Sequence, residues 1–131
     1  VQTCALPIYY YDTLMLLKQH LKERGIIILD DGYIPDESPF KHETVVKKSL
    51  LLGEIDRAGM KVLREYVETE GDSSEEYRIQ LDQIKTRCRE LSARFPEKAI
   101  LFDDYVKTQE KEYSNIKNDI VCSTLVIAEA E

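Results

Sequence analysis

The strongest constraint on the fold is the run Ile26-Ile27-Ile28-Leu29, which is apolar throughout and shows no alternation. Such a run predicts a strand that is buried on both faces, as in a mostly parallel sheet flanked by helices. Asp30-Asp31-Gly32-Tyr33 follows directly, and these turn-forming residues predict that the strand stops there. The segment therefore predicts an α/β domain with polar side chains at the carboxyl end of a buried strand.

The segments around this strand alternate between helical and extended patterns. Residues 11–21 predict a helix, and Gly25 is expected to take the left-handed conformation after it. A second helix is predicted from about residues 42–44 to Gly59, and residues 60–67 predict a second strand. Helix, strand, helix, strand with short connections predicts two neighbouring parallel strands.

After Gly71 the pattern changes to two longer helices, at residues 74–94 and 97–116, with Pro96 in the first turn of the second. The apolar stripe of the first consists of Tyr77, Leu81, Ile84, Cys88, Leu91 and Phe95. Residues 120–128, IVCSTLVIA, predict a final strand. The two stripes are expected to pack against each other and the sheet edge. An alternative function for the chain is that of a non-catalytic α/β module, which would dock a partner protein through this helix pair.

Charge and cysteine usage restrict the class of protein. The net charge is −7, and the basic residues are interspersed with acidic ones, which argues against nucleic acid as a direct partner. No apolar run is long enough to span a membrane, so we expect a soluble chain and no membrane partner. Cys88 and Cys122 lack CxxC spacing and a neighbouring His cluster, which favours reduced thiols in a cytoplasmic protein over a metal site or disulfide.

Residues 1–8, VQTCALPI, have neither strand nor helix periodicity, and Pro7 interrupts them. The string looks like the translated end of a common sequencing adapter, and the adapter's next base agrees with a Tyr codon at Tyr9. We interpret residues 1–8 as a scar outside the fold. Cys4 and Pro7 then have no functional weight, and the natural N-terminal part is expected to be missing.

Several motifs, in this order, resemble the C-terminal half of class I S-adenosylmethionine-dependent methyltransferases. In that family a helix runs into Leu-Lys-Pro-Gly-Gly, and an apolar fifth strand follows that ends in acidic residues. Here Leu21, Lys22 and Gly25 match, whereas Glu23-Arg24 replaces Pro-Gly. The family's Ala-Gly-Phe before the sixth strand is matched by Ala58-Gly59-Met60. The helix pair and the last strand correspond to a variable helical insertion and an antiparallel seventh strand.

The resemblance implies an α/β fold: the last three strands of a Rossmann-like methyltransferase sheet, with flanking helices and a two-helix insertion, over residues 9–131. The family's Gly-rich cofactor turn has no counterpart, because the glycines here stand singly. We therefore expect the cofactor-binding half to be missing and no residue of this chain to bind S-adenosylmethionine. The implied function is methyl transfer to a small-molecule or unidentified acceptor, by an enzyme that is inactive as this truncated chain.

The candidate site residues follow from the position of the acidic pair. Open α/β sheets bind ligands at the carboxyl ends of their strands, so Asp30, Asp31 and Tyr33 are predicted to contact the substrate. Asp31 and His42 are the candidate general bases. Asp30-Asp31 is interpreted as a turn that lines the acceptor pocket without metal, and a magnesium site is the alternative. Tyr33 could cover an acceptor ring and Tyr9-Tyr10-Tyr11 could border the acceptor site, but packing is the favoured role of both. For His42 a surface or helix-capping role is favoured over catalysis.

Overall fold

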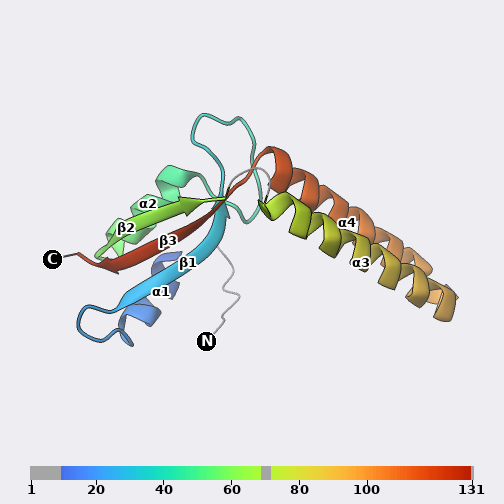
Figure 1. The fold of residues 1–131 in the computed structure, drawn as a ribbon, viewed down its shortest axis with the longest axis horizontal. Coiled ribbons are helices and arrows are strands. Elements are labelled where there is room, and N and C mark those ends of the chain that lie inside the picture. Colours follow the sequence, from blue (N-terminus) through green and yellow to red (C-terminus); the bar gives the residue numbers. More distant parts are fainter. Residues whose placement is uncertain (1–9, 69–71, 131) are drawn as a thin grey trace. The chain divides into compact units, whose positions relative to one another are not determined.

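The computed structural model describes residues 10–68 and 72–130. The chain forms two compact units (Figure 1). The described residues up to Val67, together with those from Ile120 onward, make the unit that contains the sheet, and the described residues between Glu68 and Asp119 make the unit that contains the helix pair.

The sheet has three strands, β1 (Ile26–Tyr33), β2 (Met60–Val67) and β3 (Val121–Glu129), in the order β1-β3-β2. Both outer strands run antiparallel to β3. The prediction that the first two strands are neighbours is therefore wrong, because β3 lies between them. Ile127 and Leu125 of β3 are almost completely buried. The central position therefore lets β3 bury its apolar side chains, which stabilises this strand order.

The strand β1 continues through the acidic pair to Tyr33 instead of stopping at Asp30. Asp30 lies opposite Thr124, and Tyr33 lies opposite Val121, so the whole segment is paired with β3. The turn prediction is wrong because ladder pairing overrides the turn preference of Asp and Gly. Gly32 is needed here for space, since a Cβ at this position would lie 2.6 Å from Cγ2 of Ile120.

Two helices, α1 (Tyr10–Lys18) and α2 (Lys48–Arg57), pack on one face of the sheet (Figure 1). Their buried side chains contact those β1 and β3 residues that point to the same face. This core consists of Tyr10, Leu14, Ile27, Tyr33, Leu51, Ile55, Ala58, Met60, Leu125 and Ile127.

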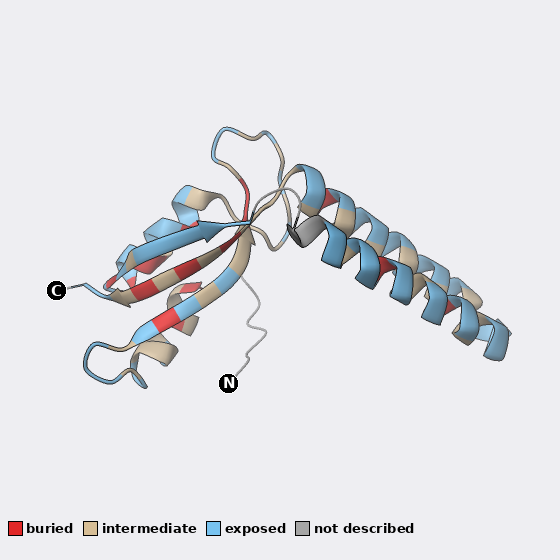
Figure 2. Ribbon diagram, viewed as in Figure 1, coloured by how far each residue is buried: buried red, intermediate tan, exposed pale blue. Residues whose placement is uncertain are grey.

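The opposite face of the sheet is exposed within this unit (Figure 2). Ile28 is 64% exposed and Ile26 is 51% exposed, whereas Ile27 between them is buried. The predicted burial of this run on both faces is thus absent from this unit. An isoleucine run without alternation nevertheless has the composition of a strand that is covered on both sides.

The ends of α1 and α2 differ from the expectation at one point and agree with it at another. Arg24, and not Gly25, has the positive φ, at 62°. Gly25 is instead required for close packing, because a Cβ there would lie 2.8 Å from the Lys22 carbonyl oxygen. Gly59 has a φ of 68° directly after α2, which confirms it as the residue that ends this helix.

The second helix begins at Lys48, several residues later than predicted. The preceding segment is extended, because Lys47 forms a parallel bridge with Ile34, and the Ile34 amide donates to the Val46 carbonyl. The Asp36 carboxylate accepts a hydrogen bond from the Ser49 amide at 3.1 Å and so satisfies a free donor in the first turn.

The second unit is an antiparallel helix pair, α3 (Asp72–Arg94) and α4 (Ala99–Asn118). The 3₁₀ turn η2 (Pro96–Lys98) connects them. Pro96 therefore begins this turn and does not lie in the first turn of α4, as was predicted. Leu81 and Cys88 are buried, which confirms the predicted stripe, although Phe95 at its end is exposed. In the part of the chain that the structure describes, no helix is long and apolar enough to cross a membrane.

Candidate functional site

The two adjacent carboxylates of β1 point to opposite faces of the sheet. Asp31 lies on the face covered by helices, where its Oδ2 accepts a hydrogen bond from the Tyr10 hydroxyl at 2.7 Å. Its Oδ1 accepts from the Gly32 amide, also at 2.7 Å. Asp30 lies on the exposed face, where its Oδ1 accepts from the Thr124 hydroxyl at 3.0 Å. Because successive side chains of a strand alternate between faces, these carboxylates do not converge on one ion.

The Tyr10 contact ties the start of α1 to the carboxyl end of β1. Tyr10 is 7% exposed, and burial together with the Asp31 carboxylate raises the pKa of its phenol well above the usual value. The phenol therefore stays protonated and remains a donor to Asp31. A carboxylate has about four lone-pair positions, so Asp31 can still accept from a further group.

A second polar cluster contains Tyr33, Glu65 and Lys48, from β1, β2 and the first turn of α2. The Tyr33 hydroxyl donates to Oε1 of Glu65 at 2.8 Å. The Lys48 ammonium binds both oxygens of the same carboxylate, at 3.0 and 2.8 Å, and lies 4.8 Å from the centre of the Tyr33 ring. We call these three residues the Tyr33 cluster.

The Tyr33 cluster spans the sheet. Tyr33 and Glu65 belong to the two outer strands, and between them lies β3, whose Ser123 is buried. Lys48 holds the pKa of the Glu65 carboxyl below its usual value, and Glu65 raises the pKa of the Lys48 ammonium. Burial is the main cause of the raised pKa of the Tyr33 phenol. At neutral pH the cluster is therefore an ion pair that accepts a hydrogen bond from a neutral phenol.

His42 lies in the loop between β1 and α2, and its Nδ1 is bound within that loop. Nδ1 accepts from the backbone amides of Thr44 and Val45, each at 3.2 Å. Its ring lies 6.2 Å from that of Phe40, centroid to centroid. An Nδ1 that accepts two amide hydrogens has its lone pair engaged, which competes with a role of this nitrogen as general base. These hydrogen bonds close a turn of the loop and do not cap a helix, because α2 begins only at Lys48.

The structure thus separates the predicted site residues. Asp31 and Tyr33 lie on the face covered by helices, at the carboxyl end of β1, whereas Asp30 lies on the other face. Their predicted contact with substrate, and catalysis by Asp31 or His42, stay predictions. Tyr10 has a buried packing role, and Tyr9 lies outside the described residues.

Sequence reasoning missed Lys48 and Glu65. Glu65 lies in an outer strand where a charged residue is ordinary, and Lys48 is one of two consecutive lysines. The available signal was the position of Glu65 near the carboxyl end of its own strand, which in an α/β sheet is the ligand-binding end.

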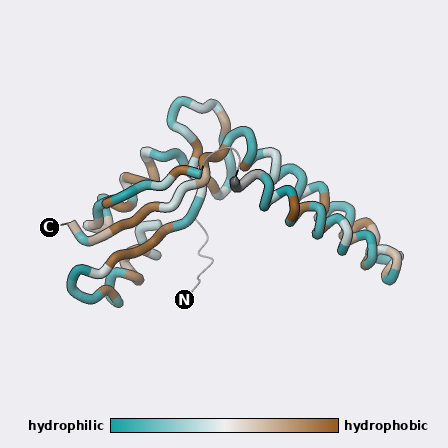
Figure 3. Tube along the Cα trace, in the orientation of Figure 1, coloured by the Kyte–Doolittle hydropathy of each residue, from teal (hydrophilic) through white to brown (hydrophobic). Residues whose placement is uncertain are grey.

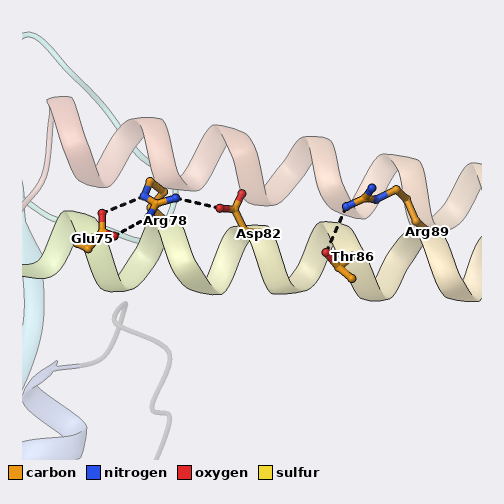
Figure 4. Close-up of polar contacts among 5 residues, drawn as sticks. All are labelled: Glu75, Arg78, Asp82, Thr86 and Arg89. Carbon is orange, nitrogen blue, oxygen red and sulfur yellow. Dashed lines mark hydrogen bonds and ion pairs between the residues drawn. The ribbon is translucent and has the colours of Figure 1, made fainter.

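The helix pair carries many charged contacts on its surface. Arg78 binds Glu75 and Asp82 along α3, and Arg89 donates to the Thr86 hydroxyl at 3.2 Å (Figure 4). Such exposed pairs along one helix support its helical conformation and contribute little else. Among the described residues, no three His, Cys, Asp or Glu side chains are grouped so that they could hold a metal ion.

Comparison with models of known protein families found no match, and comparison with curated protein sequences found none either. Among solved structures, the fold is similar to that of a SAM-dependent methyltransferase from Geobacter sulfurreducens in complex with S-adenosyl-L-homocysteine. The TM-score is 0.65 and the sequence identity is 14%, and the alignment covers 91% of this chain and 51% of that chain. The fold is therefore of the methyltransferase-like α/β class. The chain spans about half the length of this solved methyltransferase.

Proposed function

We propose that this chain is the C-terminal half of a S-adenosylmethionine-dependent methyltransferase, and that it forms the acceptor side of the active site. One observation supports this most directly. The sheet order β1-β3-β2, with an antiparallel β3 that follows a helix pair, aligns over most of the chain with the solved methyltransferase. A sheet of this order with its last strand reversed is far more specific than any single motif in the sequence.

In our proposal the described residues of this chain do not form the cofactor site. The described glycines occur singly, and a Cβ at Gly32 or Gly59 would meet a side chain of the protein itself. A backbone cradle for a nucleotide needs several such positions together. In our proposal the part of the protein that precedes this chain therefore binds S-adenosylmethionine.

The proposed contribution of this chain is to bind and orient the acceptor. The acceptor would lie at the carboxyl end of β1, with its acidic hydrogen directed at Asp31, while Tyr33 packs in the core beside it. Asp31 would take up the proton as the acceptor's nucleophilic atom attacks the methyl group in line. Tyr10, which stays protonated, would hold the carboxylate in position. Methyl transfer depends mainly on such positioning and on exclusion of water.

Calorimetry with S-adenosylmethionine tests the placement of the cofactor half. Residues 9–131 alone are expected to show negligible affinity, and the same residues preceded by the upstream part of their reading frame are expected to bind. Tight binding by residues 9–131 would show that the cofactor site has been placed in the wrong half. Failure of the longer protein to bind would exclude the methyltransferase function.

The role of Asp31 is tested in the longer protein with Asp31→Asn. Loss of a general base lowers kcat by about 100-fold or more. Asp30→Asn is the matched control, because it changes the neighbouring carboxylate on the other face of the sheet and should leave kcat within about twofold. Equal effects of the two substitutions would exclude Asp31 as the base.

A further inference from the structure

The helix pair has a groove along one of its sides, between α3 and α4, with a volume of about 470 Å³. This volume falls in the range of roughly 300–1,000 Å³ that sites for small molecules occupy. The apolar part of the groove consists of Cys88, which is 8% exposed, and the half-buried Val106. Apart from the apolar residues that recur along each helix, the surface of the pair is mostly hydrophilic (Figure 3).

Two basic side chains line the groove, one from each helix. Arg89 follows Cys88 on α3, and Lys107 follows Val106 on α4. Because the two helices are antiparallel, the residue after an inward position turns to the same side of the pair on both helices. The two cations therefore flank the apolar part of the groove.

The charges of these two side chains are weakly engaged. Arg89 has no carboxylate partner among the described residues: its Nε donates to the Lys85 carbonyl oxygen at 3.4 Å, and its Nη2 donates to the Thr86 hydroxyl at 3.2 Å (Figure 4). Both acceptors belong to α3 itself, so the other hydrogens of the guanidinium remain available to a ligand. Lys107 is paired along α4 with Asp104 at 3.6 Å, and exposed pairs of this kind are weak.

Two carboxylates also line the groove, and they determine the charge that a ligand meets. Glu110 forms an ion pair with Lys85 on the other helix, at 2.7 Å, so these two charges cancel. Asp103 has no ion pair in the described part of the chain and offsets one of the two cations. The groove therefore has one positive charge in excess, from Arg89 and Lys107 against Asp103.

We infer that this groove binds a small organic monocarboxylate. The planar fork of the Arg89 guanidinium matches the two oxygens of a carboxylate, and the Lys107 ammonium lies on the opposite helix as a second donor. A short apolar chain would lie on Cys88 and Val106. A single negative charge balances the excess positive charge, whereas a phosphate dianion would exceed it and be repelled by Asp103. The site lies within the helix pair alone and does not depend on the proposed methyltransferase function.

NMR titration of the 131-residue chain with hexanoate tests the site. Amide signals around Cys88 and Val106 should shift, with half-saturation at roughly 1 mM or below. Acetate lacks the apolar chain and should bind at least about tenfold more weakly, and hexylammonium has the opposite charge and should not bind. The absence of a saturable shift up to about 20 mM hexanoate would overturn the inference, as would equal binding of acetate or hexylammonium. Tighter binding of hexyl phosphate than of hexanoate would overturn the assignment to a monocarboxylate.

Substitution of Arg89 separates a specific site from general attraction of an anion to basic side chains. Arg89→Gln should weaken hexanoate binding at least about tenfold, because it removes a charged donor. Arg87→Gln is the matched control, since Arg87 lies on the same helix, pairs with Glu90 and does not line the groove, and it should change the affinity by less than about twofold. Equal losses in the two variants would overturn the inference.

Arg89→Lys shows that a loss of binding does not come from a loss of structure. The Arg89 side chain bonds only to α3 among the described residues, so its variants should keep the helical signal in circular dichroism. Arg89→Lys keeps the charge but loses the fork, and its affinity for hexanoate should lie between those of the unmodified chain and Arg89→Gln. Affinity as low as that of Arg89→Gln in a folded Arg87→Gln-like background of unchanged helicity would still require the fork, whereas full affinity in both Arg89 variants would overturn the inference.

Discussion

The Tyr33 hydroxyl donates to the Glu65 carboxylate at 2.8 Å, and this bond joins the two outer strands across the central one. Neither strand contacts the other through its backbone. The side-chain contact therefore adds a connection at the carboxyl ends of the two outer strands that strand pairing does not provide. Lys48 links the same carboxylate to α2, so one acidic residue connects two strands and a helix.

The connection should appear as energetic coupling between Tyr33 and Glu65. Tyr33→Phe and Glu65→Ala are each expected to lower the free energy of unfolding by about 1 kcal/mol, and alanine is used at position 65 because a glutamine oxygen would still accept from the Tyr33 hydroxyl. In a double-mutant cycle the two losses should fall short of additivity by about 1 kcal/mol, as measured by urea unfolding. Additive losses would show that the hydrogen bond has no net effect on stability.

Glu65 should also make the stability of the chain depend on acid pH. Lys48 lowers the pKa of Glu65 in the folded state, so its contribution is complete above the unfolded value of about 4.3 and disappears as the pH falls through the lower folded value. Between about pH 6 and pH 3, thermal unfolding should lose less stability in Glu65→Gln than in the unmodified chain. Glu37→Gln removes one exposed carboxylate and measures the general effect of the charge change. Equal acid dependence of Glu65→Gln and the unmodified chain would contradict the predicted role of Lys48.

Tyr10→Phe should destabilise the chain although it keeps the buried ring. The substitution removes the donor to Asp31 and leaves a partly buried carboxylate with fewer partners, which costs about 1.5 kcal/mol. Tyr11→Phe is the control, because it removes a phenol on the next residue while the ring stays under the Arg57 guanidinium, 4.0 Å away. If the two variants unfolded at the same urea concentration, the Tyr10 hydrogen bond would be without effect.

Two glycines should respond to alanine in opposite directions. Gly53 lies within α2 and has open space where a Cβ would be, so Gly53→Ala should stabilise the chain by about 0.5–1 kcal/mol. Gly32→Ala should destabilise it by about 1–2 kcal/mol, because the new methyl group would collide with Ile120. Thermal unfolding measures both, and a stabilised Gly32→Ala would mean that β1 and β3 are less closely packed than described.

The sequence by itself determined the types and order of the elements, because these depend on local periodicity. The second strand was placed at its observed bounds, and the helix pair was recognised by stripes whose inward positions, Leu81 and Cys88, are buried. The end of α2 at Gly59 also followed from local chemistry, since the positive φ favours glycine.

Only the tertiary structure decided the neighbours of each strand and the direction of each side chain. The acidic pair was expected to act together at a turn, but pairing with β3 keeps the segment extended and sends Asp30 and Asp31 to opposite faces. Glu65 and Lys48 join Tyr33 because β3 places the outer strands at a distance that long side chains can span. Contacts between residues far apart in the chain depend on strand order, and local periodicity contains no information about strand order.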